Sequence, residues 1–117
     1  MTFDENRVRA ALWKSWSRDS AVQWTKERPF DGQCNVTAAV IADVFGAEIL
    51  STPWNEITDH YYNRIDGVTY DLTDEQFDEP VQYADTPSSH ETASQGFSAA
   101  EFEALKTAFL KNMEFEA

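Results

Sequence analysis

The chain has 117 residues, of which 42% are hydrophobic and 14% aromatic, with a formal net charge of −12. This length and composition fit one folded domain over residues 1–117 and argue against disorder. No apolar run is long enough to span a membrane, the N-terminus lacks a signal-peptide pattern, and the single cysteine cannot form an internal disulfide. We therefore expect a cytoplasmic protein that does not cross a membrane.

The negative charge is concentrated in the middle of the chain. Residues 1–30 carry six basic and four acidic groups, whereas residues 31–105 carry fifteen acidic groups against Arg64 alone. Such a stretch repels phosphate backbones, so direct nucleic-acid binding is not expected. Three interpretations stay open: a solvated surface that aids solubility, adaptation to a salty cytoplasm, or an acidic face that engages a basic protein.

Helical patterns dominate the first half of the chain. Apolar spacing predicts a helix over residues 3–16 with Asp4 as its N-cap, and residues 17–33 have the composition of a loop. A second helix should begin at Gln33 or Cys34 and end at Gly46, which suits the left-handed position that closes a helix. This helix is apolar on most sides, so we expect it to be central and buried.

The second half begins with strand patterns. Residues 47–51 predict a short strand, and residues 60–72 predict a β-hairpin, because Asp66-Gly67 suits the two-residue turn between β-rich segments. A single helical turn should follow at 73–77, and the polar stretch 80–96 should be irregular. Ser98 and Glu101 form a capping box that opens a last helix. The pattern predicts an α+β fold with the Cys34 helix packed on a small antiparallel sheet and helices at both ends.

Cys34 is the first candidate for chemistry. It follows Gly32-Gln33 and lies at the start of an apolar helix. The free N–H groups at a helix start favour a thiolate and can stabilise an oxyanion next to the sulfur. A free cysteine is also among the most buried residue types, so a purely structural role is the alternative.

The hairpin supplies two partners for Cys34. With a two-residue turn, His60 and Asp71 fall on the same face as diagonal neighbours, within reach of a hydrogen bond. A carboxylate there could orient the imidazole and stabilise its protonated form. The opposite face, which holds Tyr61 and Ile65, is more apolar. If the central helix packs on that face, His60 and Asp71 should point away from Cys34.

Other candidate residues are secondary. Gln33 could donate its amide to an oxyanion, and Trp24 could form part of a substrate-binding wall. One cysteine and two histidines do not make zinc-site spacing, the acidic residues 74–79 lack the EF-hand pattern, and there is no phosphate-binding glycine loop. We therefore expect no metal and no cofactor.

Several motifs together resemble one family of small microbial proteins. They are Trp16-Ser17, Trp24, Pro29, Gly32-Gln33-Cys34, Val36-Thr37-Ala38, Phe45-Gly46, Glu48-Ile49-Leu50, His60-Tyr61-Tyr62-Asn63-Arg64, Gly67, Asp71-Leu72-Thr73 and Gln76-Phe77. In this order they are similar to the YunG family, over about residues 12–77. Ala47 departs from the family, which often has a second glycine there. The family has no established activity, so the resemblance implies relatives and no substrate.

The order of a helix-start cysteine, a strand histidine and a strand aspartate is also similar to the papain-like and transglutaminase-like superfamily. That resemblance implies that Cys34 is the nucleophile, His60 the base and Asp71 its orienting group, acting on an amide or ester carbonyl. Two functions therefore stay open. One is a cysteine-dependent acyl-transfer enzyme (protease, amidase or deamidase) acting on a small-molecule or peptide substrate. The other is a non-catalytic acidic module or inhibitor that binds a basic protein and keeps Cys34 buried.

Overall fold

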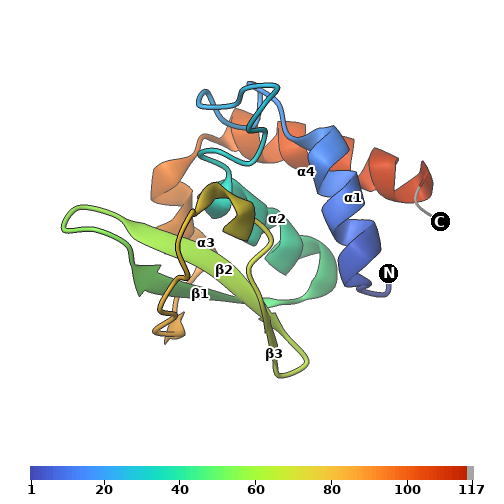
Figure 1. Ribbon diagram of the computed structural model, residues 1–117. Helices are drawn as coiled ribbons and strands as arrows, with labels where there is room; N and C mark the ends of the chain where they lie inside the picture. The colour runs from blue at the N-terminus through green and yellow to red at the C-terminus, as the bar shows by residue number, and fades with distance from the viewer. Residues whose placement is uncertain (116–117) are drawn as a thin grey trace.

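The computed structural model describes residues 1–115 as helices packed on an antiparallel sheet (Figure 1). The helical elements are α1 (Glu5–Ser15), α2 (Cys34–Phe45), α3 (His90–Ala93) and α4 (Ala99–Phe115), with two 3-10 turns, η1 (Asp74–Gln76) and η2 (Ser94–Gly96). The strands are β1 (Glu48–Pro53), β2 (Asp59–Ile65), β3 (Val68–Tyr70) and β4 (Thr86–Pro87). The predicted α+β class, with a central helix that begins at Cys34, is confirmed.

The predicted helix ends are confirmed by their capping geometry. The Asp4 carboxylate accepts a hydrogen bond from the backbone N–H of Arg7 at 3.1 Å. Gly46 ends α2 with φ 68°, a left-handed conformation that glycine adopts without steric cost. Ser98 and Glu101 each bond the other's backbone N–H, at 3.1 and 2.8 Å. Helices α1, α2 and α4 therefore begin or end where the sequence indicates.

The predicted hairpin forms with the expected register. Ile65 pairs with Val68, and the turn residues Asp66 and Gly67 both have positive φ, 50° and 81°. The sheet order is β3-β2-β1-β4, and every pairing is antiparallel. Because β3 ends at Tyr70, opposite Asn63, residues 59–62 of β2 have no strand beside them on that edge.

The stretch 80–96 contains more structure than the sequence predicted. Thr86 and Pro87 pair with β1 as β4, and the Ser89 side chain caps α3 by accepting from the N–H of Thr92 at 3.1 Å. The prediction of an irregular segment was therefore wrong for this part of the chain. A two-residue strand and a four-residue helix are too short to carry a periodic pattern.

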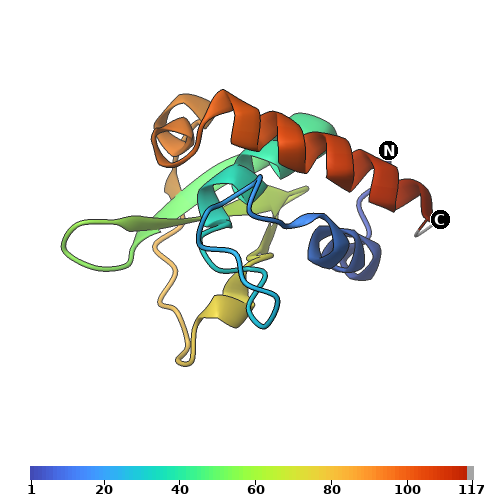
Figure 2. The same cartoon turned by 90° about the horizontal axis from the view of Figure 1, so that it is seen from above.

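Helix α2 lies between the sheet and the helix pair α1 and α4 (Figures 1 and 2). On the sheet side, Ala38 packs with Ile49 and Tyr61, and its carbonyl accepts from Asn63 Nδ2 at 3.0 Å. On the other side, a larger core joins the three helices; its fully buried members include Val8, Leu12, Val36, Val40, Ile41, Leu105 and Phe109. This double packing explains why α2 is apolar on most sides.

The opposite face of the sheet is covered by residues 81–85, which we call the covering segment. Thr52 Oγ1 donates to the carbonyl of Gln82 at 2.9 Å and accepts from the N–H of Ala84 at 3.0 Å. The Tyr62 hydroxyl donates to Asp85 Oδ1 at 2.7 Å. The covering segment is therefore tied to the side chains of β1 and β2 without being a strand itself.

Candidate active site

Cys34 is the first residue of α2, and its side chain is half-buried. Gly32 brings the chain into the helix with φ 74°, and a Cβ at that position would come within 2.5 Å of Gln23 Oε1. The thiol donates to Asn35 Oδ1 at 3.2 Å. The first backbone N–H groups of a helix have no partner within it, so α2 directs positive potential toward the sulfur.

His60 and Asp71 form a buried pair beside this helix start. His60 Nε2 lies 2.7 Å from Asp71 Oδ2, and the two side chains are only 2% and 6% exposed. Asp71 follows the last residue of β3, so the predicted diagonal contact forms although the strand has already ended. Since Nε2 faces Asp71, Nδ1 is the ring nitrogen left for another partner.

Asp71 is held by more than His60. Its Oδ2 accepts a second hydrogen bond, from the Tyr83 hydroxyl at 2.6 Å, and its Oδ1 accepts from the backbone N–H and hydroxyl of Thr73 at 3.3 and 3.4 Å. Arg9 in α1 donates to the Asp71 backbone carbonyl at 3.1 Å. The covering segment and α1 thus both help to place the carboxylate.

The surroundings of His60 raise its pKa to about 9. Burial of the ring is the largest influence and lowers the pKa, because it disfavours the charged form. The hydrogen bonds with Asp71 and Cys34, and the charges of both groups, outweigh burial. His60 is therefore an imidazolium at neutral pH, within the influence of the Cys34 side chain.

One pocket of about 280 Å³ brings Cys34 and His60 together. Its lining is Gln23, Gly32, Cys34, Asn35, Trp54, Thr58, Asp59, His60, Gln76, Phe77 and Gly96. Helix α2 packs on the Tyr61 face of the sheet, so the expectation that His60 would then point away from Cys34 is wrong. The helix start meets β2 at its N-terminal end, where no strand flanks the outer edge, and the pocket opens there.

Two other predicted site residues lie outside this pocket. The Gln33 side chain is fully buried, where its Oε1 accepts from Ser20 Oγ at 2.9 Å. Trp24 packs against the helical core, and its buried Nε1 has no hydrogen-bond partner among residues 1–115. The structure brings Gln23 and Trp54 to the pocket instead. Gln23 has no sequence signal, whereas Trp54 just before the histidine strand could have been noticed.

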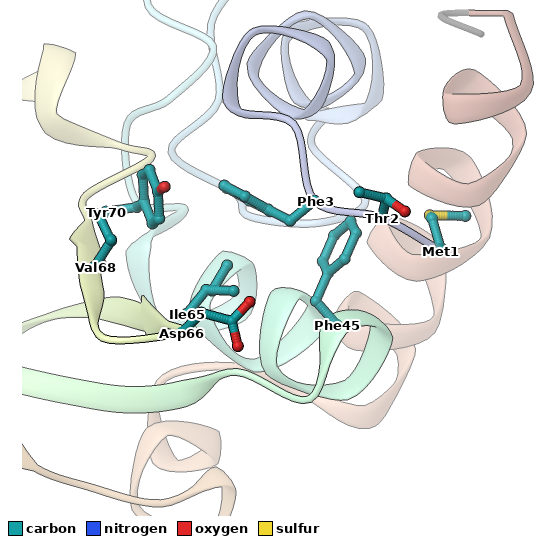
Figure 3. A pocket seen from close by; sticks show the side chains of 8 residues that line it. All are labelled: Met1, Thr2, Phe3, Phe45, Ile65, Asp66, Val68 and Tyr70. Carbon is teal, nitrogen blue, oxygen red and sulfur yellow. The ribbon is translucent and has the colours of Figure 1, made fainter.

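A second hollow, of about 380 Å³, lies by the hairpin turn (Figure 3). In it Phe3 lies between Phe45 and Tyr70, with ring centroids 5.3 and 4.7 Å away. Its lining, which also includes Ile65 and Val68, contains neither cysteine nor histidine. The thiol–imidazole combination therefore belongs to the first pocket.

The site thus combines a helix-start thiol with a buried imidazolium–carboxylate pair, on an α+β scaffold. The sequence matches the family described as YunG protein over residues 4–114. It is 45% identical over 106 residues to the uncharacterized protein YunG of Bacillus subtilis (strain 168), with 91% of each chain covered. The chain belongs to the YunG family, as its motifs predicted. No solved structure is significantly similar to it.

Residues 1–115 contain neither of two features that other kinds of function require. No helix there is both long and apolar enough to pass through a bilayer. Nor do three or more histidine, cysteine, aspartate or glutamate side chains in that range converge on a point where a metal ion could be held.

Proposed function

We propose that this chain is a cysteine-dependent acyl-transfer enzyme, of the protease, amidase or deamidase kind. The observation that carries the proposal is the pocket shared by the helix-start Cys34 and by His60, whose ring is held by Asp71 at 2.7 Å. A nucleophile, a base and a group that orients the base are the three parts that such chemistry needs. Their order along the chain is similar to that of papain-like and transglutaminase-like enzymes.

In the first half of the reaction, the Cys34 thiolate adds to the carbonyl carbon of an amide or ester. The negative charge moves to the carbonyl oxygen, where the N–H groups of the first turn of α2 and the Gln23 amide can stabilise it. The intermediate collapses when the carbon–nitrogen or carbon–oxygen bond breaks. The leaving group takes the proton from His60 Nδ1, and the acyl group stays on Cys34 as a thioester.

In the second half, neutral His60 removes a proton from water. The resulting hydroxide equivalent adds to the thioester carbonyl, and the thiolate leaves with the carboxylic acid as product. His60 is then an imidazolium again, so the cycle closes without a cofactor. Asp71 keeps Nε2 occupied throughout and stabilises the ring when it is charged.

The partial exposure of Cys34 also favours this proposal over the acidic binding module. The binding module predicted a buried cysteine with a structural role. In the fold, Cys34 lines a pocket together with a titratable ring. Binding of a basic protein to residues 31–105 stays a prediction that a pull-down with the Cys34→Ala variant can check.

The test is the pH dependence of Cys34 alkylation by iodoacetamide in the folded protein. If His60 stabilises a thiolate, the wild type should react at a pH well below the value of about 8.5 at which a free cysteine ionises. His60→Ala should then react only at higher pH. His90→Ala is the matched control, because the chain has two histidines and His90 lies outside the pocket.

Two results decide the proposal. Equal pH profiles in the wild type and in His60→Ala would overturn it. A reactive thiol should also accumulate a Cys34 thioester with p-nitrophenyl acetate, detected by intact-mass spectrometry, and Cys34→Ala should not. If the reactive thiol forms no thioester under those conditions, acyl transfer is refuted. The experiments would then support an activated Cys34 thiol without the proposed reaction.

A further inference from the structure

Two aromatic side chains, Trp54 and Phe77, line the pocket next to His60, and we call them the aromatic wall. The Trp54 and Phe77 ring centroids are 4.2 Å apart, and Phe77 meets the His60 ring edge-on at 4.7 Å. Trp54 is 47% exposed although it packs on Phe77. The same β1–β2 loop leaves Ile57 92% exposed. A large apolar side chain that lines a pocket and stays exposed to solvent, as Trp54 does, typically contacts a ligand.

The charged groups that line this pocket are few. Among residues 1–115, Asp59 and the buried His60 line it, and no lysine or arginine does. Within the same residues Asp59 forms no ion pair, so its carboxylate is available to a ligand.

An arginine close to the pocket is already engaged. Arg28 donates to the carbonyl of Gln76, which lines the pocket, at 3.0 Å. The same guanidinium pairs with the Asp31 carboxylate at 2.8 Å. A negative group beside Asp59 would therefore meet an unpaired carboxylate, with no arginine or lysine among the described pocket-lining residues to receive it.

We propose that the pocket accepts an amide or ester that carries an aromatic or other apolar group near its carbonyl and no negative charge at the outer end of that group. The apolar group packs on Trp54 and Phe77 while the carbonyl lies at Cys34. The volume of about 280 Å³ fits one ring-sized group. A positive charge on the outer end is favoured by Asp59. This substrate class rests on the proposed function for its reaction, but its test requires no turnover.

The test compares the alkylation rates of Cys34 with four reagents. They are iodoacetamide, N-benzyl iodoacetamide and two analogues of the latter that carry a para-carboxylate or a para-aminomethyl group. Each rate is divided by the rate of the same reagent with the urea-unfolded chain, which removes differences in intrinsic reactivity. The benzyl and aminomethyl reagents should exceed iodoacetamide by about tenfold, equivalent to about 1.4 kcal/mol of binding. The carboxylate reagent should be the slowest of the three ring reagents.

The benzyl preference is the ratio of the corrected rate with N-benzyl iodoacetamide to that with iodoacetamide. In Trp54→Ala this ratio should fall to nearly one. Trp13→Ala is the matched control, because Trp13 is similarly exposed at 42% but does not line the pocket. Folding of both variants is checked by urea unfolding, and the comparison of ring charges needs only the wild type. The inference is overturned if the wild type shows no ring preference, or if the carboxylate reagent reacts as fast as the benzyl reagent.

The two proposals fail in different ways. The proposed function is refuted by an iodoacetamide reaction that does not depend on His60, whatever the ring preference. The substrate class is refuted by equal rates with the four reagents, even if the iodoacetamide reaction does depend on His60. A folded Trp54→Ala variant that keeps the full benzyl preference would also refute the aromatic wall as the binding surface.

Discussion

Replacing Asp71 with asparagine should release His60 from the carboxylate that keeps its ring protonated. In the native protein, burial is the largest influence and lowers the pKa of His60, but Asp71 and Cys34 raise it to about 9. Asparagine keeps the size of the side chain and removes its charge. The pKa of His60 should therefore fall, because burial is then opposed by Cys34 alone.

The pKa rise of His60 in the native protein sets the scale of this change. The rise from 6.5 to about 9 corresponds to about 3 kcal/mol, at about 1.4 kcal/mol for each pKa unit, and Asp71 supplies it together with Cys34. We would measure it by NMR titration of protein labelled with ¹⁵N-histidine, with His90→Gln to assign the second imidazole. The reasoning is refuted if His60 titrates at the same pH in Asp71→Asn as in the wild type.

The pKa of His60 differs between the folded and the unfolded state, and this difference makes the free energy of unfolding depend on pH. His60 is protonated below about pH 9 in the folded state but only below about 6.5 in the unfolded state. Its contribution is therefore complete below about pH 6.5 and is lost as the pH rises through 9, by up to about 3 kcal/mol. So that the thiol does not enter the comparison, urea unfolding should compare Cys34→Ala with Cys34→Ala/His60→Gln. The first should lose more stability between about pH 6 and 9.5, and equal losses would contradict the pairing.

Two further predictions concern the support of the site. Tyr83→Phe removes the hydroxyl that shares Oδ2 of Asp71 with His60, so the carboxylate should act more strongly on the imidazolium and the pKa of His60 should rise. The same NMR titration should show no rise in Tyr62→Phe, whose hydroxyl bonds a different carboxylate. Gly32→Ala should destabilise the fold more than Gly46→Ala in urea unfolding. At both positions φ is positive, which costs a residue with a Cβ about 1–2 kcal/mol. Of the two, only Gly32 would also bring the new Cβ into collision with a neighbouring side chain. Equal losses of unfolding free energy in the two variants would contradict this.

Much of the fold could be predicted because its signals are local. The Asp4 cap, the Ser98–Glu101 capping box and the Asp66-Gly67 turn each depend on atoms within a few residues of one another. The hairpin register then follows from the turn, and it brings His60 and Asp71 together although eleven positions separate them. Strand alternation and turn geometry are sufficient for that contact.

Outside the stretch 80–96, the sequence by itself therefore determined the elements, the helix start at Cys34 and the His60–Asp71 pair. Only the tertiary structure decided what surrounds them. Tyr83 reaches Asp71 because the covering segment crosses the outer face of the sheet, and Trp54 and Gln23 meet the pocket because their loops lie there. Loops lack the periodicity that places helices and strands, so their partners depend on the packing of the whole chain. For the same reason Gln33 was a reasonable candidate from its place beside Cys34, yet its side chain points to Ser20.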